Sequence, residues 1–283
     1  MGQPRPSVRR RRVASLLIRH REAAGKTPDE AALRIDCHRS KISRVENAWL
    51  PVSSSELRDL LTFYGVDDPA YVEEVVALNR LCSERGWAQR FDITPPSYVD
   101  YIDYEESASH IRSFQPMMVA GLLQTADYAR AVYRASPFDI PRERIEELVA
   151  VRLERQKVLD RTEPPQFSVI LGEAALRGHV GGVDVLRKQL GHLRELGNRP
   201  NIELQVLPFT AGAHAGIMGS FVLFGFATTA FSEVACVEHQ AGMIYMEEPE
   251  ETSAYTLTFD SLCSSALSSS ESLDLLTRVI REL

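Results

Sequence analysis

Apolar residues in the first quarter of the chain recur at helical spacing. A first helix is predicted over 8–24, and its apolar face is formed by Val13, Leu16, Leu17, His20 and Ala24. Gly25 offers a C-terminal stop. A short second helix begins at Pro28, because Thr27 and Glu30 form a capping box around it.

Three more helices follow in the same pattern. A third helix is predicted over 38–47 with Ile42 and Val45 pointing inward. After Pro51, a second capping box starts a fourth helix whose apolar stripe is Leu57, Leu60, Leu61 and Tyr64. A fifth helix starts at Pro69 and runs towards Gly86, where the first domain is expected to end. The pattern predicts an all-α bundle of about five helices over 1–86.

The pattern changes from Trp87 onward to a mixture of helix and strand. Ile202, Leu204 and Val206 alternate with polar residues, as in a half-buried strand, whereas 221–226 is continuously apolar and predicts a strand covered on both faces. Further strands are predicted over 167–171, 234–237 and 243–246, and helices over 98–107, 125–135, 142–161, 183–196, 250–266 and 270–283. The fold class is therefore α+β overall, with an all-α N-terminal bundle followed by a mixed α/β domain over 87–283.

Charge divides the chain in the same place. The net charge of -7 argues at first against a nucleic-acid binder, because DNA affinity depends largely on neutralising phosphates. Through Val66, however, 13 Lys and Arg stand against 7 Asp and Glu, a net +6, and the remaining 19 against 32 give -13. A basic head on an acidic body is the distribution expected when only the head contacts DNA.

Cysteines and hydropathy narrow the class of protein further. The four cysteines, Cys37, Cys82, Cys236 and Cys263, form no CxxC pair, so we expect reduced structural thiols, no metal site and no cofactor. The start of the chain lacks a leader pattern, and no run of about 18 apolar residues occurs. A cytoplasmic location is expected.

The strongest motif is the segment 27–46, TPDEAALRIDCHRSKISRVE. Ala32 is small where two helices would meet at a steep angle, and Asp36 occupies the tight turn, where Asp tolerates the left-handed region better than most residues. Over its two helices the segment resembles the helix-turn-helix of the Cro/phage-repressor (xenobiotic-response-element) family, which usually has glycine at that turn. The resemblance implies a DNA-binding transcription regulator.

A recognition helix presents hydrogen-bonding side chains from its N-terminal half to the major groove. The side chains of this kind are His38, Arg39, Ser40, Lys41, Ser43 and Arg44. By the resemblance, Arg39, Ser40 and Arg44 match base-reading positions, and Thr27 with the helix start at Pro28 matches a phosphate anchor.

Other charged and polar residues of the head are expected to have different partners. Lys41 and Ser43 are assigned to phosphate, and Glu46 is expected to pair locally. The run 9–12 with Arg5 is either a DNA arm or a solvated helix start. Because one such helix reads only a few base pairs, we expect a homodimer on a pseudo-palindromic operator in double-stranded DNA.

The C-terminal part carries a second set of strings. They are IRSFQP (111–116), GLLQTADYAR (121–130), RLERQ (152–156), GEAALR (172–177), QVLPFTAGAH (205–214) and 219–221. These strings resemble the C-terminal domain of actinobacterial helix-turn-helix regulators related to WhiJ, which are often described as antitoxin-like, although Ala120 stands where relatives often have proline. This resemblance implies transcriptional control together with a small partner protein of the BldB-like kind.

Two alternatives to a partner-controlled regulator remain open. The controlling signal could be a small molecule, for which the loop with Gly212, His214, Gly216 and Gly219 is a candidate, although a loop between strands needs glycine for geometry alone. An enzyme with an accessory head is not expected, because the histidines are scattered and HExxH, GxSxG and P-loop motifs do not occur. Glu173 with Arg177 is either catalytic or an ordinary helix-start carboxylate. Tyr128 and Arg130 are packing and pairing residues or line a partner groove.

Overall fold

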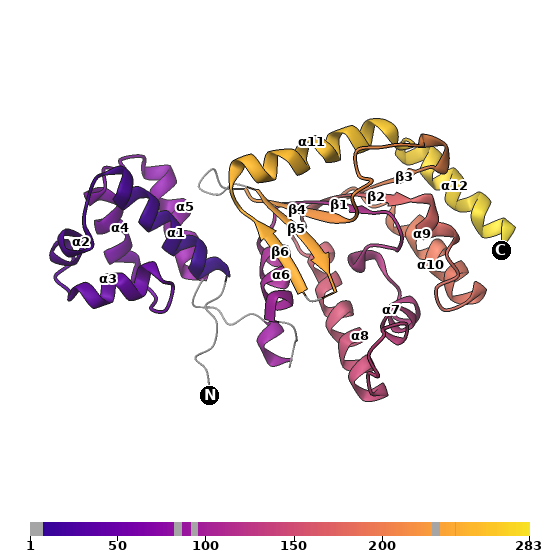
Figure 1. Ribbon diagram of the computed structural model, residues 1–283, viewed down its shortest axis with the longest axis horizontal. Coiled ribbons are helices and arrows are strands. Elements are labelled where there is room, and N and C mark those ends of the chain that lie inside the picture. The colour runs from indigo at the N-terminus through magenta and orange to yellow at the C-terminus, as the bar shows by residue number, and fades with distance from the viewer. Residues whose placement is uncertain (1–7, 82–86, 92–95, 228–232, 241) are drawn as a thin grey trace. The chain divides into compact units, whose positions relative to one another are not determined.

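The computed structural model describes residues 8–283 except 82–86, 92–95, 228–232 and 241 (Figure 1). These residues form two compact units, one up to Tyr104 and one from Glu105 onward. Within the described ranges, no helix combines the length and the apolar character that a bilayer span requires.

The first unit contains the five predicted helices. They are α1 (Val8–Ala23), α2 (Pro28–Arg34), α3 (Arg39–Glu46), α4 (Ser54–Phe63) and α5 (Pro69–Leu81), followed by a 3-10 turn η1 (Trp87–Arg90) and by α6 (Pro96–Ser107). The predicted all-α bundle is confirmed. The continuation of the fifth helix to Gly86 lies outside the described residues.

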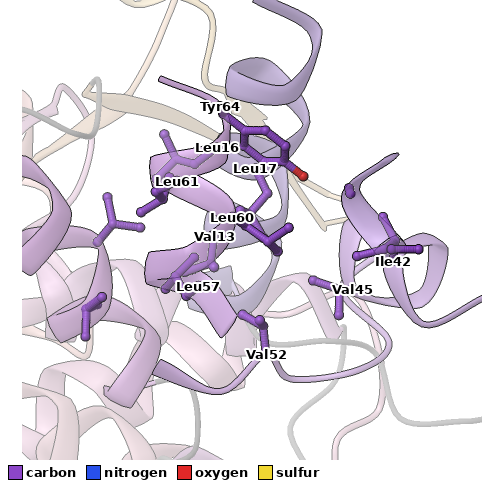
Figure 2. Packing of buried hydrophobic residues seen from close by; sticks show 14 residues of the cluster. Val13, Leu16, Leu17, Ile42, Val45, Val52, Leu57, Leu60, Leu61 and Tyr64 are labelled. Atoms are coloured by element: carbon purple, nitrogen blue, oxygen red, sulfur yellow. The ribbon is translucent and has the colours of Figure 1, made fainter. Parts of the chain in front are cut away.

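Leucines of α4 lie at the centre of the bundle. Figure 2 shows Leu57, Leu60 and Leu61 among side chains of α1 and α3, and all three are at most 1% exposed. Removing a leucine side chain from water contributes about 1.5–3 kcal/mol. The capping boxes at Thr27 and Ser53 form as the sequence predicts, so the helices start where the core requires them.

The first four helices end with the same backbone motif. Each is followed by one residue with positive φ, namely Gly25 (64°), Asp36 (48°), Ala48 (61°) and Gly65 (78°). The next amide donates to a carbonyl five residues earlier, as in the 2.8 Å bond from Trp49 to Arg44. This is a Schellman motif, which normally places glycine at the positive φ. The left-handed turn at Asp36 is confirmed, and Ala48 is a second departure that the sequence pattern did not predict.

The second unit is built on a six-stranded mixed sheet. Its strands are β1 (His110–Gln115), β2 (Gln166–Gly172), β3 (Ile202–Leu207), β4 (Phe221–Gly225), β5 (Val234–His239) and β6 (Gly242–Met246). The order is β3-β2-β1-β4-β5-β6, where the pairs among β1, β2 and β3 are parallel and the others antiparallel. The mixed α/β domain and five of its strands are confirmed.

Strand β1, in the middle of the sheet, is the one strand that the sequence pattern missed. Its two large apolar residues, Ile111 and Phe114, point to opposite faces because they are three positions apart, and both are buried. Arg112 and Ser113 lie between them, so the segment shows neither alternation nor a continuous apolar run.

Helices cover both faces of this sheet (Figure 1). They are α7 (Ala126–Arg134), α8 (Arg142–Gln156), α9 (Glu173–Arg177), α10 (Val183–Leu196), α11 (Pro249–Ser265) and α12 (Ser269–Glu282), with 3-10 turns η2 (Gly121–Leu123), η3 (Lys157–Asp160) and η4 (Phe209–Ala211). The helix predicted over 142–161 is thus divided into α8 and η3. Helix α11 packs on β3, β4 and β5. Along β3, Val206 donates its amide to Ser272 at the start of α12, which closes that edge.

Candidate nucleic-acid interface

The start of α3 is fixed by the side chain of the residue before it. The Nδ1 atom of His38 accepts a hydrogen bond from the Ser40 amide at 3.3 Å and lies 3.0 Å from the Ser40 hydroxyl. On the inner side of the helix, Ile42 and Val45 are 1% and 4% exposed. The core therefore fixes the rotation of α3 about its axis.

This rotation turns most of the predicted site residues outward. Arg39, Ser40, Ser43 and Arg44 are exposed on α3. Within the described part of the chain, no hydrogen bond or ion pair engages the Arg44 guanidinium. Asn47 lies four positions after Ser43 on the same face, and its side chain donates to the Ser43 carbonyl at 2.7 Å. Helical counting from Ser43 would have added Asn47 to the candidate residues.

Arg39 is held only weakly. Its guanidinium lies 3.4 Å from a carboxylate oxygen of Asp29 on α2, and both side chains are more than 60% exposed. An exposed pair of this kind contributes roughly 0–1 kcal/mol, so Arg39 can leave Asp29 at low cost.

Lys41 has a different environment. Its ammonium pairs with Glu56 on α4, and that carboxylate also accepts hydrogen bonds from the amide and hydroxyl of Ser53. Burial acts to raise the pKa of Glu56, but the bonds from Lys41 and Ser53 outweigh it and hold the pKa below its ordinary value. Lys41 thus joins α3 to the start of α4, and its phosphate role stays a prediction.

Thr27 is occupied in the capping box. Its hydroxyl donates to the Glu30 carboxylate at 2.8 Å while it accepts from the Glu30 amide at 3.2 Å. Pro28 follows at the first helical position. A phosphate approaching Thr27 would therefore meet the Glu30 carboxylate, and only the amides at the helix start favour an anion there.

Glu46 forms a long-range pair instead of the expected local one. Its carboxylate accepts from Arg21 on α1, with Nε–Oε1 at 2.6 Å and Nη2–Oε2 at 3.3 Å. Burial, followed by the Glu46 charge, raises the pKa of the neighbouring Tyr64 to about 12. The pair links the C-terminal end of α1 to the C-terminal end of α3. A sequence pattern cannot show a contact between residues this far apart.

Arg11 and Arg12 of the arginine run in α1 belong neither to a solvated helix start nor to a free arm. Arg11 binds both carboxylate oxygens of Asp100 at 3.1 and 2.9 Å, and Arg12 is 7% exposed with its guanidinium over the Tyr104 ring. These two cations are engaged within their own unit. Arg5 lies outside the described residues.

The strings of the C-terminal unit form a buried polar network. Gln124 donates to the Val119 carbonyl and accepts from Arg152, each at 2.7 Å. Gln189 accepts from the Thr125 amide and donates to the Leu123 carbonyl, also at 2.7 Å. Buried amide side chains thus satisfy backbone groups of 119–125, and Arg152 in turn holds the side chain of one of these amides, Gln124.

Candidate catalytic groups of this unit have structural partners. Glu173 accepts from the Phe209 amide at 2.9 Å and from Arg177 at 2.7 Å, and these bonds hold its pKa low although burial alone would raise it.

Burial raises the pKa of the Cys236 thiol to about 12. Among the described residues, no cluster of His, Cys, Asp and Glu could hold a metal ion. Cys82 lies outside those residues.

Arg130 borders a cleft, whereas Tyr128 does not. Tyr128 is fully buried and its hydroxyl accepts from the Val119 amide. Arg130 pairs with Asp127 and Glu146, both at 2.7 Å. The cleft of about 490 Å³ is lined by Asp127, Arg130, Ala131, Arg134, Arg142, Glu146, Gly181 and Val185. Three arginines against two carboxylates make it basic within an acidic unit.

Known families match both units. Residues 12–74 match a helix-turn-helix domain, and residues 98–278 match a domain of unknown function, DUF5753. No curated protein and no solved structure matches the chain. The helix-turn-helix match supports a DNA-binding regulator rather than an enzyme. The Cro/repressor-type and WhiJ-like relationships stay predictions. The chain belongs to the DUF5753 family, and a helix-turn-helix domain precedes its family domain.

Proposed function

We propose that this protein is a sequence-specific transcription regulator that reads its operator with α3. The observation that carries the proposal is the exposed face of that helix, where Arg39, Ser40, Ser43 and Arg44 point away from a core that fixes Ile42 and Val45. Arginine can bridge the two acceptors of guanine, and serine hydroxyls bond to base edges or phosphates. No rearrangement of the bundle is needed to free Arg44.

The operator is proposed to be a pseudo-palindrome bound by a homodimer. Two copies place two recognition helices about 34 Å apart, one helical turn of DNA, and so double the number of base pairs read. Selection of binding sites from random duplexes, followed by footprinting, tests this. A single asymmetric site protected by a monomer would contradict the proposal.

The C-terminal unit is proposed to receive the controlling signal from a small partner protein. The basic cleft beside α7 and α8 adjoins a second cleft of about 350 Å³ that includes Tyr133, Phe138 and Ile145, and Phe138 is 72% exposed. Arginines next to an exposed aromatic suit an acidic partner segment that also carries an apolar anchor.

A small anionic ligand is the second candidate, because the volume of the basic cleft falls in the range of ligand pockets, about 300–1,000 Å³. Mass spectrometry of proteins captured from the native cell by the wild-type chain and by Arg134→Glu/Arg142→Glu separates the two. Arg187→Glu, at a half-exposed position of α10, is the matched control. A protein lost only from the cleft variant supports a protein partner. A rise in melting temperature with purified metabolites alone favours the small ligand.

A further inference from the structure

Exposed apolar side chains gather at one end of the C-terminal sheet. Of the large hydrophobic residues that are exposed in the described chain, five lie in two loops, and their exposure ranges from 42% to 95%. They are Met117, Met118, Phe209, Ile217 and Met218. We call these five residues the methionine patch.

The sheet order brings the two loops together. Residues 116–120 follow β1, and residues 208–220 run from the end of β3 to the start of β4. Because the order is β3-β2-β1-β4, the second loop must cross the ends of β2 and β1, and Phe221 then pairs with Phe114. Met117 and Met118 therefore lie beside the last residues of the crossing loop.

The interior holds both loops in place. A β-carbon on Gly172 would collide with the carbonyl of Pro116, and one on Gly216 would collide with Phe114. The Val119 amide and carbonyl are both bonded to buried side chains, and the Phe209 amide is bonded to Glu173. The backbone of the patch is thus ordered before any partner binds, which lowers the entropic cost of association.

The two loops contain no charged residue. The 5 residues of 116–120 and the 13 of 208–220 include no Asp, Glu, Lys or Arg, in a chain that is 25% charged. An apolar patch of this kind marks a protein interface, and methionine adapts well to an apposed surface. A basic partner protein, attracted by the negative charge of the C-terminal part, would bind where carboxylates are exposed. The methionine patch has no carboxylate and does not suit such a partner.

We infer that the methionine patch is the contact between two copies of this chain. The residues after Val66 carry -13, so two copies repel each other wherever their acidic surfaces meet. The uncharged patch avoids that repulsion, and an apolar surface is complementary to itself, as a two-fold interface requires. The inference rests on the proposed function in one respect: the proposed pseudo-palindromic operator needs a homodimer, and the methionine patch would form the contact of that homodimer.

The test uses the full chain in sedimentation experiments over a range of concentrations. Two patch variants are made, Ile217→Asp/Met218→Asp and Met117→Lys/Met118→Lys, with Leu257→Asp on α11 as the exposed control. Wild type and control are expected to dimerise. Each patch variant should dimerise roughly 100-fold more weakly, because the substitutions place charges of one sign in an apolar contact.

An equimolar mixture of the two patch variants is expected to recover the dimer, since aspartates would face lysines. Circular dichroism of each variant verifies its fold. A wild type that stays monomeric, or variants that all still dimerise, would overturn the inference. Footprinting of the control on a selected operator tests the proposed function separately. A protein that dimerises through the patch but binds no specific DNA sequence would contradict the proposed regulator and would still support the dimer contact.

Discussion

Arg21 and Glu46 join the end of α1 to the end of α3 through two hydrogen bonds, and each side chain is only 11% exposed. Arg21→Ala should lower the free energy of unfolding by about 1–3 kcal/mol, because it leaves a mostly buried carboxylate without its partner. Urea unfolding measures the change. Arg58→Ala is the control, since its pair with Glu73 is exposed and should contribute about 1 kcal/mol or less. Equal losses in the two variants would contradict the role given to Arg21.

The turn between α2 and α3 can be improved. Asp36 has φ 48°, a region that costs residues other than glycine free energy. Asp36→Gly should therefore stabilise the protein by about 0.5–1 kcal/mol, the strain released less the entropy that glycine adds to the unfolded chain. Asp36→Asn removes the charge but keeps a side chain that tolerates this region, so it should leave the melting temperature nearly unchanged. A gain of the same size in the asparagine variant would assign the effect to charge.

His20 makes the stability of the bundle depend on pH. Its Nε2 atom lies 2.7 Å from the Tyr71 hydroxyl, and burial, followed by the charge of Arg19, lowers its pKa from the ordinary 6.5. A lowered pKa in the folded state means that the unfolded chain binds the proton more readily. The contribution of His20 is therefore present above pH 6.5 and is lost as the pH falls below it.

The melting temperature of wild type should accordingly fall more between about pH 7 and pH 5 than that of His20→Gln. Glutamine keeps a hydrogen-bond partner for Tyr71 without titrating. His192, whose pKa burial also lowers, is present in both proteins and cancels in the comparison. Parallel curves for the two proteins would exclude His20 as the cause.

Arg44→Ala and Arg39→Ala should each cost about 1–3 kcal/mol at the best operator and relax the sequence preference, because a lost base contact depends on sequence. Lys41→Ala should weaken all DNA equally and flatten the salt dependence by about 1 unit. If Lys41 only pairs with Glu56 and does not contact DNA, the substitution leaves the salt dependence of DNA binding unchanged and lowers only the free energy of unfolding. Titrations at several salt concentrations on operator and random DNA distinguish these outcomes.

The sequence predicts local features of this fold well and distant ones poorly. Each capping box, at Thr27 and at Ser53, depends on residues within a four-residue segment, so the sequence shows it directly. The exposed face of α3 likewise follows from the spacing of Ile42 and Val45. The partners of Arg21, Lys41 and Arg11 come from other helices, so no periodicity reveals them. The central strand β1 escaped prediction because Arg112 and Ser113 interrupt the continuous apolar run that is expected of a strand covered on both faces.

The position of β1 in the sheet has a consequence for synthesis on the ribosome. Residues 110–115 pair with 166–171 on one side and with 221–225 on the other, so the sheet cannot close until the chain has grown more than 100 residues past its central strand. The apolar core of the N-terminal bundle is formed by residues within 13–78 and can form long before that. A nascent chain should thus carry a finished DNA-reading head while its other half is still an open, apolar set of strands, and that half is where chaperones are expected to bind.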